Sequence, residues 1–471
     1  MRPSNFSTKL LWLLLGGLVL VSAGLYNGYP LVTPDTGTYV QSALSFNVPD
    51  DRPVTYGLFI LYTSLFKKTL WFVIFAQSVL LAWLMLRYVE EFVPRFTSAF
   101  WRVALLALTA WATGISWYSS QLMPDIFTSI GLLALGLVLL GRSRSKPETG
   151  FLLFVVLASE MMHNSNLLIY TMVVLGFGIV AGVKKLFKQQ IVRRVTWLIV
   201  TTVVLSGWVV LPALHKSLGG DFAVSRSSHA FLMARLVESG VMDKFLKDNC
   251  GPANSYSLCP YRDNLPNDAI AFLWDGNSPM NKAGGWDVVR DEYKLIIQDI
   301  LTSPSYYPYL ISDGIQSTLR QLTHIGHGDG LQVSREGTTP YDRIRDFAPF
   351  ELKKYMNSLQ NRGQLNFATL NERTYGTHLW ALVALGLVLA TPLRKRISLD
   401  LLIVVVVLGL GIVSNAFVTG ALANVLDRLQ GRVSWLLPFV ALLVVAEHGP
   451  AVLQYLHHLA TSAQREPTDV A

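Results

Sequence analysis

The sequence predicts an all-α polytopic membrane protein with about ten transmembrane helices and one large, mainly helical exported loop. Three observations lead to this fold class: the composition, the series of hydrophobic segments, and the position of the basic residues between them. Of the 471 residues, 51% are hydrophobic and only 15% are charged, whereas soluble domains carry about 25% charged residues. The composition therefore excludes an ordinary soluble enzyme.

The distribution of charge also indicates a membrane. The net charge is +8, but the segment 214–377 holds 17 Lys and Arg against 18 Asp and Glu. The excess of basic residues therefore flanks the hydrophobic segments and forms no basic stripe of the kind that binds nucleic acid. We expect the lipid bilayer as a partner, and no nucleic acid.

Ten segments are predicted to span the bilayer, which requires ~20 mostly apolar residues per helix. These segments are 10–26, 69–88, 103–121, 126–141, 151–168, 170–183, 195–213, 378–393, 399–420 and 433–449. With the N-terminus inside, sixteen Lys and Arg fall on the cytoplasmic side and five in the short outer connections. The positive-inside rule then predicts that both termini are inside and that the large loop is outside.

This topology divides the chain into four parts. Residues 1–213 form an N-terminal transmembrane module with a first exported loop at 27–68, and residues 214–377 form an exported soluble domain. Residues 378–449 are the C-terminal transmembrane helices, and residues 450–471 are a cytoplasmic tail. Residues 1–23 also resemble a secretory signal with a cleavage site at Val21-Ser22-Ala23, and cleavage would leave the topology unchanged.

The exported domain has 164 residues, which is enough for a core of its own. Its predicted helices are 229–248, 286–301, 305–324 and 342–359. Cys250 and Cys259, which are the only cysteines, lie nine positions apart on the side that this topology makes oxidising. We expect them to form a disulfide that orders the loop and performs no redox chemistry.

Polar residues at membrane depth are costly, so each of them invites a functional interpretation. In this sequence they gather toward the outer side. The set comprises Asp35, Arg52, Asp125, Glu160, His163, Asn164, Asn166 and Arg432. A proton or ion pathway would place charges through the full depth of the bilayer, so the pattern predicts a site at the outer interface.

Each of these residues also has a structural alternative. Asp35 and Asp125 follow prolines and are placed to cap the helices that begin beside them. Glu160 and His163, three positions apart, are placed to satisfy each other on one helical face. Arg432 is placed to reach lipid headgroups as an interfacial anchor.

The segment HIGHGD contains His324, His327 and Asp329 and is a weak candidate for a metal site. Two histidines three positions apart in a glycine-rich loop are not specific for metal. A divalent metal therefore stays an open alternative, and the sequence names no certain cofactor.

The order of the motifs resembles the GT-C superfamily of integral-membrane glycosyltransferases, which use polyprenyl-phosphate sugars. PDTGTY (34–39) followed by RPVTYG (52–57) is similar to their first exported loop, which forms two interfacial helices and carries an acidic residue. That acidic residue corresponds to Asp35, and the second interfacial helix to 54–68. MPDIF resembles a second acidic position, here Asp125, and QGRVSWLLPF resembles the Arg that contacts the donor phosphate, here Arg432.

The resemblance implies transfer of a sugar from a polyprenyl-phosphate donor to an envelope glycan, lipid or protein at the outer face of a bacterial inner membrane. It implies that Asp35 acts as the catalytic base on the acceptor hydroxyl and that an arginine stabilises the leaving phosphate. The substrate-binding candidates are Tyr39, Arg52, Asp125, Glu160, His163, Asn164 and Arg432.

The chain also departs from the superfamily pattern. TPDTGTY contains a single acidic residue where many members have two, so metal dependence is not implied. The 164-residue loop matches no acceptor domain of the superfamily, and the layout is also similar to a family of bacterial membrane proteins without assigned function. A lipid or glycan transporter, which expects polar residues through several spans and a repeat, and a non-catalytic assembly factor are the alternative functions.

Overall fold

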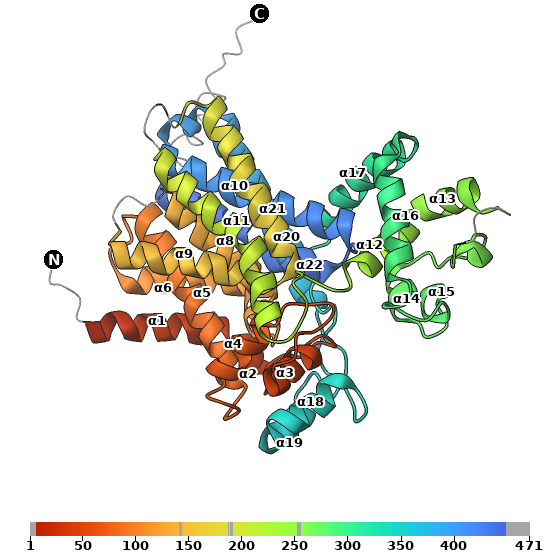
Figure 1. Ribbon diagram of the computed structural model, residues 1–471. Coiled ribbons are helices and arrows are strands. Elements are labelled where there is room, and N and C mark those ends of the chain that lie inside the picture. Colours follow the sequence, from red (N-terminus) through yellow and green to blue (C-terminus); the bar gives the residue numbers. More distant parts are fainter. Residues whose placement is uncertain (1–5, 141–143, 187, 189–191, 252–255, 449–471) are drawn as a thin grey trace, which may run out of the picture.

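The computed structural model describes residues 6–140, 144–186, 188, 192–251 and 256–448. The predicted cytoplasmic tail at 450–471 lies outside these residues. The described chain is all-α, and its only extended pairing is an isolated bridge between Leu31 and Gln121. Figure 1 shows a large helical bundle with a smaller helical lobe beside it.

Within the described chain, five helices are long and apolar enough to cross a membrane. They are α5 (Trp71–Phe92), α10 (Asn164–Val183), α11 (Arg194–Ser217), α21 (Leu399–Leu422) and the span Asp427–His448, which begins with α22 (Asp427–Ser434). Three shorter apolar helices accompany them, α1 (Phe6–Leu20), α6 (Ala99–Ala112) and α8 (Asp125–Leu140). α9 (Lys146–Met161) and α20 (Ala368–Ala390) lie at the two remaining predicted spans.

The bundle surrounds α8, in which every residue is buried. The peripheral helices instead expose large apolar side chains, such as Leu198 on α11 and Leu379 on α20. An extended apolar surface of this kind suits contact with lipid and is unusual for a soluble monomer. The fold is therefore that of a membrane protein.

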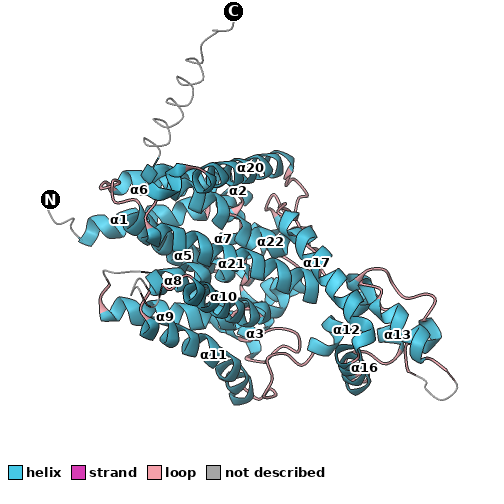
Figure 2. Ribbon diagram, turned by 90° about the horizontal axis from the view of Figure 1, so that it is seen from above, coloured by secondary structure: helices cyan, strands magenta, loops and turns pink. Residues whose placement is uncertain are grey.

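Basic residues that the sequence predicts to be cytoplasmic form ion pairs at one end of the bundle. Arg87 near the end of α5 pairs with Glu148 at the start of α9, and Arg95 pairs with Glu447. In both overall views this end, where α1, α6 and α9 begin, lies opposite α22 and the smaller lobe (Figures 1 and 2). Arg87 and Arg95, two of the residues that the sequence assigns to the cytoplasmic side, therefore both form ion pairs at this end.

Two predicted spans are broken in the structure. The span 10–26 consists of α1 and α2 (Ser22–Asn27), which are separated at Val21. The span 103–121 consists of α6 and α7 (Ile115–Ser119), which are separated around Gly114. The His327 ring occupies the space beside Gly114, where an added Cβ would lie 1.9 Å from His327 Cε1. This close contact comes from a loop more than two hundred residues away.

The predicted boundary between spans 151–168 and 170–183 is also wrong. α9 ends at Met161 and α10 begins at Asn164, because His163 caps α10 by accepting the Ser165 N–H at 3.2 Å. Asn164 and Asn166 therefore belong to α10 and not to the preceding helix.

The first half of the segment 214–377 forms the smaller lobe. Its helices are α12 (Ser228–Glu238), α13 (Val241–Asn249), α14 (Ala269–Trp274), α15 (Pro279–Lys282) and α16 (Arg290–Thr302). They enclose a separate core that includes Met233, Phe245, Phe272 and Ile296. The Cys250–Cys259 disulfide is present, as predicted. The predicted helix 229–248 is interrupted at Gly240, which has φ 73°.

The second half of this segment packs on the bundle instead. α17 (Tyr307–Thr323) lies along α21, where the Ser317 carbonyl approaches Gly420. α18 (Thr339–Phe347) lies against α3 (Thr36–Ser45), and α19 (Leu352–Met356) follows it. Ile344, Phe347 and Tyr355 join the core of the bundle. α4 (Thr55–Thr63) lies within the expected interfacial helix 54–68 and is shorter than predicted.

Candidate functional site

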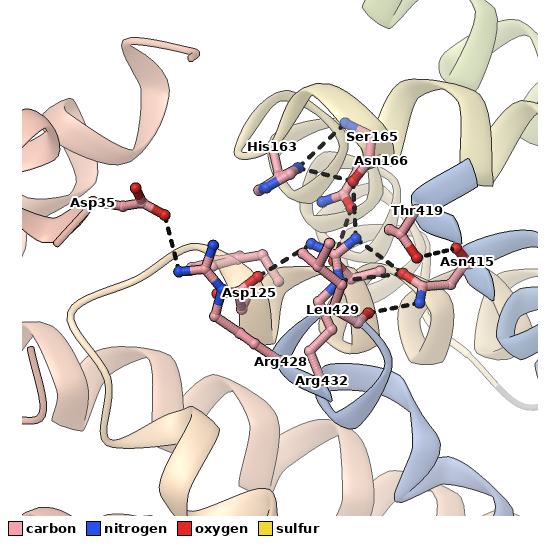
Figure 3. A network of polar contacts seen from close by, with 12 residues as sticks. Asp35, Asp125, His163, Ser165, Asn166, Asn415, Thr419, Arg428, Leu429 and Arg432 are labelled. Carbon is pink, nitrogen blue, oxygen red and sulfur yellow. Dashed lines mark hydrogen bonds and ion pairs between the residues drawn. The ribbon is translucent and has the colours of Figure 1, made fainter. Parts of the chain in front are cut away.

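Most of the predicted polar residues meet where α3, α8, α10, α21 and α22 approach one another. Figure 3 shows Asp35 and Asp125 on separate elements, each joined to an arginine of α22. We call this set of ion pairs and hydrogen bonds the arginine–aspartate network. It contains Asp35, Asp51, Arg52, Asp125, His163, Asn164, Ser165, Asn415, Arg428 and Arg432.

Asp35 occupies the N-cap position of α3, but its side chain makes no capping hydrogen bond. Its Oδ1 lies 3.2 Å from Arg52 Nη1, and its Oδ2 lies 2.9 Å from Arg428 Nη1. Burial alone would raise the pKa of this carboxyl, but the charges of Arg428 and Arg52 outweigh burial and lower the pKa to about 2. The side chain remains 28% exposed. Asp35 is therefore an accessible carboxylate held between two cations.

Arg52 is fixed from several sides. Its Nε and Nη2 donate to Asp51 Oδ2 at 3.1 and 2.6 Å, and Nη1 faces Asp35. Its guanidinium also lies 5.2 Å from the centre of the Tyr39 ring, within the range of a cation–π interaction. Tyr39 is only 2% exposed, so its ring supports Arg52 from within the core.

Arg432 is the deepest cation of the network. Its side chain has no exposed surface, and its Nη1 donates to Asp125 Oδ1 at 3.1 Å. Nε and Nη2 donate to Asn415 Oδ1, and Nη2 also donates to Ser165 Oγ. The expectation that Arg432 acts as a lipid-headgroup anchor is therefore wrong, because protein side chains surround its guanidinium.

Asp125 is the first residue of α8, and its carboxylate faces Arg432. Its Oδ2 has no hydrogen-bond partner among the described residues. The carboxylate is 1% exposed. Asp125 and Arg432 thus form the closed inner part of the network, whereas Asp35 forms its open edge.

The junction of α9 and α10 supplies the third side of the network. His163 Nδ1 lies 2.8 Å from Ser165 Oγ, which in turn accepts from Arg432. Asn164 Nδ2 donates to the Asp51 carbonyl at 2.9 Å and so ties α10 to the first loop. His163 and Asn164 therefore lie beside Arg432 and Asp51, together with other residues of the predicted polar set.

Glu160 lies apart from the network. Its two carboxylate oxygens are buried without a hydrogen-bond partner in the described chain, and they face Gly207 of α11. The expected pairing of Glu160 with His163 is wrong. α9 ends at Met161, so the two residues do not lie on one face of the same helix.

Arg428 is the functional candidate that the sequence analysis missed. It is 18% exposed, it pairs with Asp35, and its Nε has no partner among the described residues. Arg428 and Arg432 lie four positions apart on α22 and therefore share one helical face. That spacing is the sequence signal that could have identified Arg428.

The side chains of His324, His327 and Asp329 in the HIGHGD segment contact three different partners. His324 lies 3.3 Å from Asp427, whereas His327 is buried against Thr374 at 3.0 Å. Asp329 accepts the backbone N–H of Arg428. The described residues contain no group of three or more metal-ligating side chains.

Protein-family models, curated proteins and solved structures provide no match to this chain.

Proposed function

We propose that this protein is a membrane glycosyltransferase that moves a sugar from a polyprenyl-phosphate donor to an envelope acceptor at the outer face of a bacterial inner membrane. The observation that carries the proposal is the accessible Asp35 carboxylate between Arg52 and Arg428. Ten spans with both termini inside and a GT-C-like arrangement belong to the same proposal. The five long apolar helices and the polar end of the bundle support it.

The arginines supply the affinity for the donor phosphate. A guanidinium has five N–H donors in a planar fork that matches phosphate. Most donors of Arg52 and Arg432 already bind protein oxygens, whereas Arg428 contacts Asp35 through Nη1 and retains an unpartnered Nε. We therefore assign the main phosphate contact to Arg428, with Arg432 holding Asp125 in place.

Donor binding would also change the chemistry of Asp35. In the ligand-free protein the two arginines hold the pKa of Asp35 at about 2, which makes it a weak base. A donor phosphate that draws Arg428 toward itself would weaken that ion pair and raise the pKa of Asp35. The carboxylate would thus become a better base when the donor is bound.

The reaction is then a displacement at the anomeric carbon of the donor. The acceptor oxygen forms a bond to that carbon while the bond from the carbon to the phosphate oxygen breaks. The electron pair leaves with the polyprenyl phosphate, whose charge Arg428 and Arg52 stabilise. The proton of the acceptor hydroxyl passes to Asp35.

The proposal is tested with the full chain in liposomes and a panel of polyprenyl-phosphate sugars. We expect one donor to release polyprenyl phosphate when an envelope extract supplies the acceptor. The same turnover should occur in Asp50→Asn, because Asp50 lies in the same loop but is 56% exposed and pairs with Arg226. No turnover of any donor, together with unchanged envelope glycans in a deletion strain, would reject the proposal.

A further inference from the structure

A cavity of about 330 Å³ lies between the α1–α2 junction, α6, α7 and the start of α20. Small-molecule sites in proteins have volumes of ~300–1,000 Å³. The polar and aromatic lining residues are Ser22, Trp111, Thr113, Ser116, Trp117 and Arg373. No member of the arginine–aspartate network lines this cavity, so it is a separate place in the fold.

Arg373 is the unusual residue of this cavity. It makes no hydrogen bond or ion pair with a side chain that the structure describes, and its Nε is buried without a partner. Its guanidinium lies 4.7 Å from the centre of the Trp111 ring. A partly buried guanidinium without a counter-charge is costly, and its fork of donors fits an oxyanion.

The cavity adjoins the apolar surface of the bundle. Trp111 is 61% exposed, and Leu108, one turn before it on α6, is 46% exposed. On α20, Leu379 and Leu382 are 64% and 58% exposed shortly after Arg373. Trp and Arg at the edge of an apolar surface are typical of the headgroup level of a bilayer. A lipid whose phosphate binds Arg373 would therefore have its apolar chains along α6 and α20.

We propose that this cavity binds the phosphate headgroup of a membrane lipid, with Arg373 pairing with the phosphate and the lipid chains lying on α6 and α20. The hydroxyls of Ser22 and Ser116 provide further donors to the phosphate. This inference goes beyond the proposed transferase and does not rest on it, because neither Asp35 nor Arg428 takes part. A phospholipid and a polyprenyl phosphate share the required chemistry, and the test separates them.

The test measures binding to the full chain, delipidated in a neutral detergent, by native mass spectrometry. The probes are phosphatidylglycerol, polyprenyl phosphate, dioleoylglycerol as a lipid without phosphate, and glycerol 1-phosphate as a phosphate without lipid chains. We expect phosphatidylglycerol or polyprenyl phosphate to bind. Whichever of these two lipids binds more tightly identifies the class of ligand. Equal binding of dioleoylglycerol would overturn the phosphate contact, and equal binding of glycerol 1-phosphate would overturn the lipid assignment.

The variants localise the site. Arg373→Gln should weaken binding of the lipid phosphate at least about tenfold, and Arg373→Lys should weaken it less. Trp111→Leu, at an exposed position that should not affect folding, should also weaken it. Arg193→Gln, an exposed cation at the N-cap of α11 that does not line the cavity, is the matched control and should bind as the wild type. Equal binding by Arg373→Gln, Trp111→Leu and Arg193→Gln would overturn the site, whatever the outcome for Asp35→Asn.

Discussion

Arg428 and Arg432 lie one turn apart on α22 and hold two different aspartates, Asp35 at 2.9 Å and Asp125 at 3.1 Å. The two pairs differ in exposure. Arg428 and Asp35 are 18% and 28% exposed, whereas Arg432 and Asp125 are 0% and 1% exposed. One turn of helix thus joins an accessible ion pair to an inaccessible one. Replacing the two arginines should therefore affect different properties, stability for one and turnover for the other.

Lysine at each position separates these roles, because it keeps the charge and loses the guanidinium fork. Arg432→Lys should destabilise the protein by about 1–3 kcal/mol, since Asn415 and Ser165 lose a buried partner. Arg428→Lys should leave the melting temperature nearly unchanged and reduce donor turnover about 10- to 100-fold, the value of a charged hydrogen bond. Thermal unfolding in detergent and turnover in liposomes measure the two effects. A loss of stability in Arg428→Lys, together with a loss of turnover at unchanged stability in Arg432→Lys, would contradict the proposed roles of the two arginines.

Gly114 should not tolerate alanine. The new Cβ would lie 1.9 Å from His327 Cε1, so the ring and its loop must move, which typically costs about 1–3 kcal/mol. Gly150→Ala is the matched control, because an added Cβ there meets no atom within 4 Å and alanine is the better helix former. A melting temperature for Gly114→Ala at or above that of Gly150→Ala would show that the contact is wrong.

His327 should make stability depend on pH. Burial, with help from His378 and Arg373, lowers the pKa of His327 to about 3, so the folded protein keeps this ring neutral where the unfolded chain protonates it. Stability should therefore fall by up to about 1.4 kcal/mol per pH unit as the pH drops from about 6.5 toward 3. The melting temperature of His327→Gln should depend less steeply on pH over this interval. Parallel pH curves for the variant and the wild type would reject this account.

The Cys250–Cys259 bridge should stabilise the smaller lobe. Closing so short a loop is worth about 2–3 kcal/mol in the chain-entropy treatment. The variant with both cysteines replaced by serine should lose protease resistance between α12 and α16 and keep its donor turnover, because the bridge contacts no member of the arginine–aspartate network. Free thiols at both positions in protein from its native membrane would contradict the pairing.

Labelling tests the expected sidedness. Gly276→Cys, at an exposed position of the smaller lobe, should react with an impermeant thiol reagent applied to intact cells. Lys184→Cys, exposed at the C-cap of α10 on the side that the topology makes cytoplasmic, should react only after the membrane is opened. The reverse pattern would invert the topology.

The features that the sequence predicts well are those with a local or compositional signal. Long apolar segments predict the helices that can span a bilayer, and the nine-residue spacing predicts the disulfide. The placement of Asp35, Asp125 and Arg432 at one level follows from counting spans, and the structure brings all three into one network.

The features that the sequence does not predict depend on distant partners. The close approach of His327 to Gly114, at the break between α6 and α7, is one example, because no pattern around residue 114 encodes it. The wrong pairing of Glu160 and His163 is an exception with a local cause, since helical spacing does not continue across the end of α9, and His163 caps the next helix. The ion pair of Arg428 with Asp35 is another example, because the two residues lie far apart in the sequence and meet only in the folded chain.

The most direct test of the central claim is the envelope glycan profile of a deletion strain that carries Asp35→Asn. Asparagine keeps the shape of aspartate and removes the base, and general-base catalysis is worth ~10²–10⁴-fold. We predict that Asp35→Asn is inserted at wild-type levels but leaves the deletion profile unchanged by mass, whereas Asp50→Asn restores the wild-type profile. Full restoration of the wild-type profile by Asp35→Asn would contradict a catalytic role for Asp35 and, with it, the glycosyltransferase proposal.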